Sequence, residues 1–509
     1  MSFVVILLII LTFLSRIIGL GREITLAYFY GTSNISDAYL MSIAIPTIII
    51  TFVITSLATS YIPAYQKIES GHMVENVFTN KVMGLTFTIC LLILVVTMRL
   101  TPQIVPLFVA GFDEATMGLT ITFTRITLFA IFFMGINHVL HSFLQVKEKV
   151  LLASLSGLPF NLVSIIFITL SAYTSTYMLA IGTIIAIGSQ SVYLLTLAKR
   201  QGFKLKPHLD VKDNNIRNII LLTMPIILSN TALQIGIIVD KNLASTFGHG
   251  AVSALTYSTR VSTAISGIVI TSVLVVTFPK ISKLAVDGNI IEMKNALSES
   301  VVNMSLLIIP AIIAVAMFST PIVSLLFERG AFDSDAVSVT SSLLFFYIFF
   351  LFGDGITQLI SRVFYALGDS KTPMMVAIVT VMLNILLSFA FVHFMGISGL
   401  ALATSLSAFV GMLILMFLLR RKIGSLRLQR TLISLKKIFG AAIVCVFGAY
   451  FVYQYLVTLN ATIALLIAGI VGIAIYGLLV LVLRIREVDI LIAFIFIKVR
   501  SLIAKMRRN

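Results

Sequence analysis

The sequence contains few charged residues: lysine, arginine, aspartate and glutamate make up 11% of its 509 positions. Soluble globular proteins carry about 25%, so this shortage excludes an ordinary soluble enzyme. Apolar residues reach 59% and the mean hydropathy is +1.09, which excludes a disordered chain. The thickness of the lipid bilayer therefore sets the segment length to look for in such a chain, because a spanning helix needs about 20 mostly apolar residues.

Cysteine is also scarce, and several catalytic motifs are missing. The two cysteines, Cys90 and Cys445, lie in apolar runs, so we interpret them as small core residues rather than a disulfide or a metal pair. The sequence has no Walker A motif, no HExxH, no GxSxG and no Cys/His metal spacing. An ATP-driven pump and a membrane hydrolase therefore lack support, and no cofactor is expected.

Long apolar stretches recur along the whole chain. They predict an all-α polytopic membrane protein with about fourteen transmembrane helices. The expected helices are 3–30, 36–62, 82–107, 116–145, 151–173, 176–198, 216–246, 250–278, 297–327, 336–366, 373–394, 397–420, 433–457 and 461–484.

The distribution of basic residues along the chain tests these expected helices. The chain has 36 Lys and Arg against 20 Asp and Glu, a formal net charge of +16. Most of the basic residues fall in alternate connectors and in the C-terminal tail, whereas the opposite connectors hold only Arg99 and Arg329. Positive charge gathers on the cytoplasmic side of membrane proteins, so both termini are expected in the cytoplasm. A nucleic-acid partner is excluded because the sequence has no single cluster of basic residues with aromatic residues among them.

A weak internal repeat, offset by about 220 residues, organises the chain. Leu107-Phe108 with Gly111-Phe112-Asp113 parallels Leu326-Phe327 with Gly330, Phe332 and Asp333; Asn161 parallels Asn384. Six helices per repeat give both halves the same orientation, a pattern typical of transporters that rock two lobes around a central site.

The expected parts are an N-lobe (1–198), a basic linker (199–217), a C-lobe (218–421), two further helices (422–486) and a basic tail (487–509). The tail is either an amphipathic helix on the anionic inner leaflet or a solvated stop-transfer segment.

Charged residues at membrane depth are the functional candidates, because each costs at least about 2.5 kcal/mol in hydrocarbon. Arg16 and Arg22 lie on the first helix, and two guanidinium groups near the central axis suit a diphosphate. The alternative is an internal salt bridge to Glu23 or Asp37. Arg260 on the eighth helix either completes this anion site or pairs with Asp240 or Glu23.

A second set of polar residues suits a cation. Asp240, with Asn384 and Thr404, supplies the oxygen ligands that a hard cation needs; the alternative is an ion pair within the second lobe. Arg125, Asp354 and Arg362 are weaker candidates, and Arg362 snorkels to the cytoplasmic surface in the simplest interpretation. Two histidines of the fourth helix, His138 and His141, have no matching ligand cluster and are interpreted as packed or pore-lining.

Several motifs carry a family resemblance. The segment Ser15–Glu23 with Asp37-Ala38-Tyr39 resembles the opening signature of the MurJ/MviN family, lipid II flippases of the multidrug/oligosaccharidyl-lipid/polysaccharide exporter superfamily. The segments Val239–Ser245, Phe327–Phe332 and Phe364–Pro373 are similar to later motifs of that family. The resemblance covers nearly the whole chain through the twelfth helix.

The resemblance implies a fourteen-helix transporter, not an enzyme, that moves an undecaprenyl-diphosphate-linked peptidoglycan precursor across the bacterial cytoplasmic membrane by alternating access. Carried over by motif, the substrate-binding residues are Arg16, Arg22, Glu23, Asp37, Asn161 and Arg260. A sodium coupling site is implied at Asp240, Asn384, Leu400 (by its carbonyl) and Thr404. Implied partners are lipid II or a related lipid-linked glycan, membrane lipids and cell-wall synthesis proteins.

The sequence departs from the family pattern at two places. The second helix often carries an arginine in the family, but here 47–62 contains no charged residue, and Ser388 stands where some members have a second sodium-binding aspartate. An alternative function is therefore the flipping of another lipid-linked oligosaccharide, of capsule, teichoic or spore-wall type. A non-transporting scaffold and a multidrug antiporter are further alternatives; the antiporter requires an acidic cavity, whereas these charges are basic.

Overall fold

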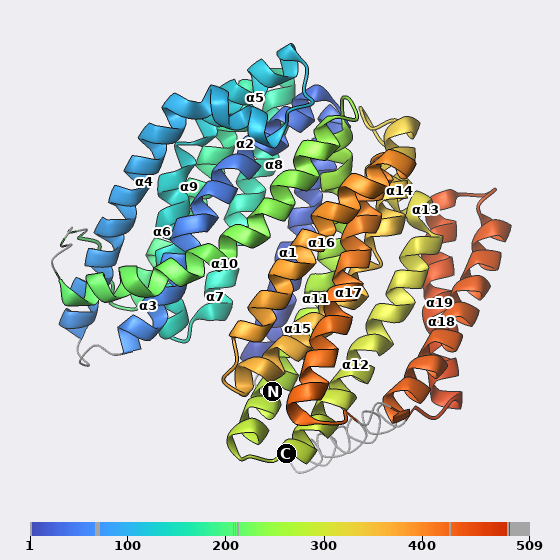
Figure 1. Cartoon of the computed structure of the whole chain (residues 1–509). Coiled ribbons are helices and arrows are strands. Elements are labelled where there is room, and N and C mark those ends of the chain that lie inside the picture. Colours follow the sequence, from blue (N-terminus) through green and yellow to red (C-terminus); the bar gives the residue numbers. More distant parts are fainter. Residues whose placement is uncertain are drawn as a thin grey trace, which may run out of the picture. The chain divides into compact units, whose positions relative to one another are not determined.

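The computed structural model describes residues 3–66, 72–206, 208, 210, 213–426, 429–485 and 488. All regular elements within these residues are helical (Figure 1), so the prediction of an all-α chain is confirmed. The expected basic tail, 487–509, lies outside the described residues apart from Val488.

Ten elements precede the linker. They are α1 (Phe3–Tyr30), α2 (Asn34–Ile50), the π-helical segment η1 (Thr51–Thr55), α3 (Ser56–Gln66), α4 (His72–Phe108), α5 (Glu114–Thr127), α6 (Ala130–Val146), α7 (Val150–Ser154), α8 (Gly157–Tyr173) and α9 (Tyr177–Arg200). The remaining elements are α10 (Asn214–Ser245), α11 (Ala251–Val286), α12 (Ile290–Met317), α13 (Ser319–Phe327), α14 (Ser334–Tyr347), α15 (Phe350–Ala366), α16 (Lys371–Met395), α17 (Ser398–Ile423), α18 (Gln429–Leu456) and α19 (Ala461–Val482).

The expected spans correspond closely to these helices. Within the described ranges, eleven helices are long and apolar enough to cross a membrane, or twelve if α5 and α6, which meet at a 51° bend, form one span. At the two other expected positions stand α1 and α10, helices of 28 and 32 residues. The chain is thus a multi-pass membrane protein, and the count of fourteen stays a prediction.

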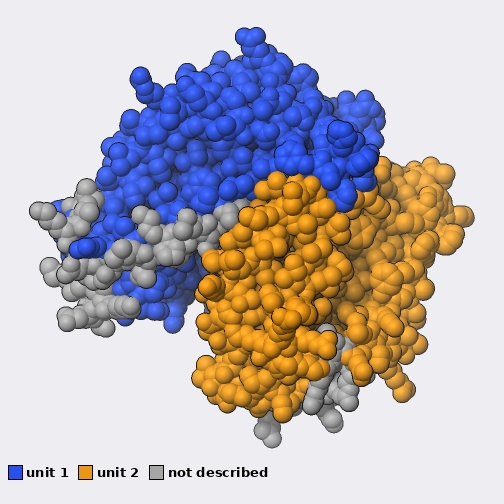
Figure 2. Space-filling view, in the orientation of Figure 1, with its two compact units in different colours: residues 1–260, 326–340, 388–400 blue, residues 261–325, 341–387, 401–509 orange. Residues whose placement is uncertain are grey.

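By its internal packing the chain divides into two compact units. Unit 1 comprises residues 1–260, 326–340 and 388–400, and unit 2 comprises 261–325, 341–387 and 401–509 (Figure 2). The predicted lobes were defined by the repeat rather than by packing, so their boundaries stay a prediction.

In unit 1, two asparagines of α4 hold the segment that follows α9. The Asn76 side chain donates to the carbonyl of Gly202 and accepts from the N–H of Lys204, both at 3.0 Å. One helical turn later, Asn80 donates to the carbonyl of Lys204 at 2.8 Å and accepts from the N–H of Lys206 at 2.6 Å. Residues four apart share one helix face, so this face of α4 binds the backbone of residues 202–206.

The next residue of α4, Lys81, contacts the segment just before α10. The Lys81 ammonium contacts Asp210 at 2.8 Å and Asp213 at 2.6 Å. Near the beginning of α10, Ile216 and Ile219 are buried in the apolar cluster that contains Tyr61. The expected linker is therefore attached at both ends rather than a free connector.

The second expected helix, 36–62, is longer and irregular. It runs from Asn34 to Gln66 and contains Pro46 and the π-helical segment η1. The Thr47 and Thr51 hydroxyls each donate to the carbonyl four residues earlier, at 2.7 Å. Such bonds back to the helix satisfy polar side chains in a membrane and often bend the helix. π-Helical segments frequently occur at functional sites.

Unit 2 contains a layer formed by α12, α18 and α19, which lie side by side (Figure 1). Cys445 of α18 is buried there, in an apolar cluster with Phe318 and Ala468. In unit 1, Cys90 is 0% exposed and packs with Ile54 and Ile131. Both cysteines are thus core residues, as the sequence predicts.

Candidate functional site

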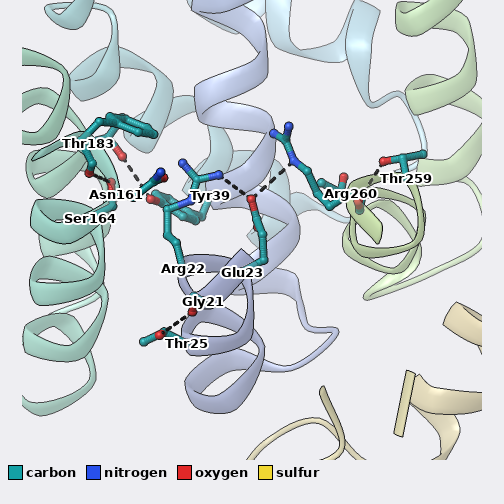
Figure 3. A network of polar contacts seen from close by, with 12 residues as sticks. Gly21, Arg22, Glu23, Thr25, Tyr39, Asn161, Ser164, Thr183, Thr259 and Arg260 are labelled. Atoms are coloured by element: carbon teal, nitrogen blue, oxygen red, sulfur yellow. Dashed lines mark hydrogen bonds and ion pairs between the residues drawn. The ribbon is translucent and has the colours of Figure 1, made fainter. Parts of the chain in front are cut away.

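Three charged side chains of unit 1 meet around one carboxylate. Glu23 of α1 forms an ion pair with the neighbouring Arg22, and Arg260 of α11 places its Nε 3.4 Å from the same Glu23 oxygen, Oε1 (Figure 3). The Glu23 side chain is 4% exposed, whereas those of Arg22 and Arg260 are 19% and 53% exposed. The group therefore combines two guanidinium charges with one carboxylate charge and remains net positive.

Close packing of α8 against α1 positions Arg22. A Cβ on Gly19 would lie 3.3 Å from Asn161 Nδ2, so glycine allows α8 to approach closely. Asn161, which is 8% exposed, donates to the carbonyl of Ser15 at 3.5 Å. The Arg22 guanidinium lies over the Phe160 ring, 5.1 Å from its centroid, a cation–π contact. Asn161 thus joins the two helices whose side chains surround Arg22.

Asp37 anchors the helix that carries Arg260. Its side chain is fully buried, and its two oxygens accept the N–H groups of Gly250 and Ser253, each at 2.7 Å. These groups lie at the N-terminal end of α11, where a negative charge is favourable. Gly250 has φ +82°, and a Cβ there would lie 2.5 Å from the carbonyl oxygen of Thr32. Asp37 therefore lies apart from the Arg22–Glu23–Arg260 group and acts on it through α11.

Arg16 is exposed on α1. None of the described residues forms an ion pair with it. It lies six residues before Arg22, about 9 Å along the helix axis at 1.5 Å per residue. The structure thus brings together three of the six predicted substrate-binding residues, adds Asn161 and Asp37 as supports, and leaves Arg16 separate.

Two residues of the surrounding network are not among the predicted substrate-binding residues. The Thr183 hydroxyl of α9 donates to the Tyr39 hydroxyl of α2 at 3.2 Å, and both residues are buried in the network of Figure 3. Tyr39 belongs to the Asp37-Ala38-Tyr39 motif, which was a usable signal. Thr183 has no sequence signal, because hydroxyl residues are common in apolar helices.

Three of the four residues expected to bind sodium take part in side-chain hydrogen bonds. In unit 1, the Ser388 hydroxyl donates to Asp240 Oδ1 at 3.2 Å. In unit 2, Asn384 Nδ2 donates to the Thr404 hydroxyl at 3.1 Å. Carboxylate, hydroxyl and amide oxygens have the chemistry that a hard cation requires. Leu400 is 1% exposed and belongs to unit 1. Because the set is divided between the units, sodium binding stays a prediction.

Comparisons with known proteins identify the family. The family model described as "Lipid II flippase MurJ" matches residues 26–498. The chain is 26% identical over 484 residues to "Probable lipid II flippase MurJ" of Thermotoga maritima, covering 94% of this chain and 96% of the relative. It is 25% identical over 426 residues to "Lipid II flippase MurJ" of Burkholderia cenocepacia, covering 81% of this chain and 82% of the relative.

Solved structures agree with this result. One described as "Lipid II flippase MurJ, inward closed conformation" has a TM-score of 0.80 at 27% identity and covers 93% of this chain and 98% of its own. An inward-facing multidrug resistance MATE family transporter of the MOP superfamily has a TM-score of 0.64 at 15% identity, covering 82% of this chain and 96% of its own; this shows a shared fold. The chain therefore belongs to the MurJ family of lipid II flippases, multi-pass membrane transporters rather than enzymes.

Proposed function

We propose that this flippase carries lipid II from the inner to the outer leaflet of the bacterial cytoplasmic membrane, and that Arg22 and Arg260 bind its diphosphate. One observation carries the assignment of the site: a single buried carboxylate, Glu23, holds guanidinium groups from two helices. Both helices lie in the part of the chain where the family motifs are found.

The chemistry of the three side chains fits a diphosphate. A guanidinium is planar and offers two edges, so one edge can stay on Glu23 while another binds a phosphate oxygen bidentately. Glu23 fixes both guanidinium groups before the substrate arrives, which reduces the entropy lost on binding. Arg16, about 9 Å away along α1, extends the positive charge toward the approaching substrate, whereas Asn161 and Asp37 position the two helices.

Transport then follows alternating access driven by the membrane potential. Moving one elementary charge through 100 mV changes its free energy by about 2.3 kcal/mol, so a site whose net charge changes on substrate binding responds to that potential. Na⁺ at Asp240, Asn384, Leu400 and Thr404 is the coupling ion we expect. Both termini face the cytoplasm, where membrane lipids and cell-wall synthesis proteins are the expected partners.

Complementation tests the assignment. In a bacterial strain depleted of its only lipid II flippase, we expect the wild-type chain to restore growth and Arg22→Ala and Arg260→Ala to abolish rescue. Arg99→Ala is the matched control, because Arg99 is an exposed arginine on α4. Normal rescue by either site variant, at wild-type membrane levels, removes the proposed diphosphate site.

The same strain tests the second candidate, another lipid-linked oligosaccharide of capsule, teichoic or spore-wall type. It is favoured by the second helix, which has no charged residue between Pro46 and Gln66. Failure of the wild-type chain to rescue, despite correct membrane insertion, supports this candidate over lipid II.

A further inference from the structure

A network of uncharged polar side chains lies within unit 1, and the proposed diphosphate site does not use it. The Asn137 amide of α6 donates to Gln190 Oε1 of α9 at 3.2 Å, and Gln190 Nε2 donates to the Ser156 hydroxyl at 3.1 Å. The Ser156 hydroxyl also lies 3.4 Å from Nε2 of His141. Asn137 and His141 are four residues apart, so they share one face of α6. We call these four side chains the α6–α9 network.

The α6–α9 network lies on the side of α9 that faces away from lipid. Val192 of α9 is apolar and 66% exposed, as expected of a side chain that contacts acyl chains. Gln190 lies about 200° around the helix from Val192. It shares a face with Thr183 and Leu194, which are 3% and 0% exposed. Gln190 therefore points into unit 1.

The network region has hydrogen-bonding capacity that the protein leaves unused. Asn137 Oδ1 is buried and has no hydrogen-bond partner among the residues that the structure describes. The imidazole of His138, three residues before His141 on α6, likewise has no hydrogen bond within the described ranges. His138, His141 and Gln190 are all partly exposed, and Gln190 keeps a second amide hydrogen for a further partner. Unpaired polar groups inside a protein are destabilising, so this region favours a polar ligand.

The α6–α9 network begins about one helical turn from the diphosphate site. Ser156 lies four residues before Phe160, about 6 Å along the axis of α8, and the Phe160 ring contacts the Arg22 guanidinium. A Cβ on Gly157 would lie 3.0 Å from Ser15 Oγ, so α8 begins in close contact with α1. All these residues belong to unit 1. The network and the diphosphate site are thus neighbours within one compact unit.

We propose that the α6–α9 network, together with His138, is a subsite for the sugar that the diphosphate carries, with Gln190, His138 and His141 binding sugar hydroxyl groups. The proposal rests on the proposed function, because it concerns the headgroup of the same substrate. A sugar hydroxyl both donates and accepts, and amide and imidazole side chains offer both functions. One helical turn is comparable to the width of a single pyranose ring, so the first sugar on the diphosphate reaches the network.

The composition of the network favours a sugar over other ligands. It contains no lysine or arginine for a phosphate or a peptide carboxylate, and no carboxylate for an ammonium group. Among the described residues, no group of three His, Cys, Asp or Glu could hold a metal ion. Asn137 and Ser156, which are 6% and 1% exposed, hold Gln190 in place before the sugar arrives. This preorganisation reduces the entropy lost on binding.

Binding to the purified full-length chain tests the subsite with two probes. One is undecaprenyl diphosphate, and the other is the undecaprenyl-diphosphate-linked disaccharide without peptide. We expect Gln190→Met and His138→Phe each to weaken binding of the disaccharide lipid about three- to tenfold, the effect of one or two neutral hydrogen bonds. Both variants should bind undecaprenyl diphosphate as the wild type does, because that probe has no sugar to lose.

Control variants separate this inference from the function on which it rests. Gln103→Met on α4 and His249→Phe before α11 replace exposed residues of the same types and should bind both probes as the wild type does. Arg22→Gln should weaken both probes. If it weakens neither, the diphosphate site fails, whereas the sugar subsite is judged by the variants of Gln190 and His138.

A second variant of His138 keeps the test decisive if Gln190→Met does not fold. His138 has no hydrogen bond to lose within the described part of the chain, so His138→Phe should leave the fold intact. His138→Gln retains a donor and an acceptor and should keep most of the affinity for the disaccharide lipid. Wild-type binding of the disaccharide lipid by the folded variants Gln190→Met and His138→Phe, or equal losses for both probes, overturns the sugar subsite.

Discussion

The Nε of Arg260 lies 3.4 Å from Oε1 of Glu23, although the two residues stand on α11 and α1. This ion pair connects two helices that the sequence repeat assigns to different lobes. Because Glu23 is almost fully buried and Arg260 is half exposed, the carboxylate acts as the fixed element and the guanidinium as the accessible one.

The first prediction concerns Glu23. Glu23→Gln removes the charge that both arginines share while keeping a side chain of the same size. We expect thermal unfolding of the purified protein to indicate a loss of about 1.5–3 kcal/mol, the range for hydrogen bonds to charged groups, together with loss of complementation. A variant with wild-type stability and full rescue would show that Glu23 does not organise the two arginines.

The second prediction concerns Asp37. Asp37→Asn retains only one side-chain acceptor, whereas Asp37 accepts N–H groups from both Gly250 and Ser253. We expect a loss of stability of about 1–3 kcal/mol, since one buried N–H loses its partner, and faster amide hydrogen exchange at the beginning of α11. Asp335→Asn is the control, because Asp335 is exposed in the first turn of α14. Unchanged exchange at Gly250 and Ser253 would contradict the anchoring role.

The third prediction concerns the asparagines that hold the linker. Asn76→Ala combined with Asn80→Ala removes all four side-chain contacts to the backbone of 202–206. Each hydrogen bond contributes about 0.5–1.5 kcal/mol, so we expect amide exchange at Lys204 and Lys206 to increase at least tenfold. Replacing Lys204 and Lys206 by Gln should leave this protection intact, because only their backbone is bound. Loss of protection in that control would indicate that the side chains hold the linker.

The fourth prediction is a pH dependence in the loop before α16. The Lys422 ammonium, helped by the N–H of Thr372, lowers the pKa of Asp369 from 3.8 to about 2. The folded state therefore favours the ionised carboxylate, and its stabilising effect is complete above about pH 4 and is lost as the pH falls through about 2. In Lys422→Met, the loss of stability between pH 5 and pH 2 should be smaller than in the wild type when both are measured by thermal unfolding in detergent. An identical pH profile in wild type and variant would exclude the pair as its cause.

Much of the fold is predictable because hydrophobicity identifies helices long enough to span a bilayer. The expected stretch 151–173 differs from the observed helical segment 150–173 by one residue, and 461–484 from α19 by two. The prediction 82–107 is less accurate, since α4 begins at His72. Its first turns carry Glu75, Asn76 and Lys81, and polar residues at a helix end resemble a connector in a hydropathy plot. Their role becomes visible only when the linker lies against them.

The residues of the candidate site were predictable from the sequence, but the carboxylate that each arginine contacts was not. A charge at membrane depth is conspicuous in a sequence, which is why the sequence identifies Arg22, Glu23 and Arg260 as candidates. Which carboxylate each arginine contacts depends on helix rotation, and the sequence left both Glu23 and Asp37 open as partners. The structure resolves this: Glu23 pairs with both arginines, and Asp37 binds backbone N–H groups of α11.

The most direct test of the central claim is the affinity of the purified full-length protein for undecaprenyl diphosphate compared with undecaprenyl monophosphate. We expect the wild-type protein and the control Arg99→Gln to prefer the diphosphate, and Arg22→Gln and Arg260→Gln each to lose this preference while remaining folded. A preference for the diphosphate that persists in both site variants would contradict the assignment of Arg22 and Arg260 as the diphosphate-binding residues.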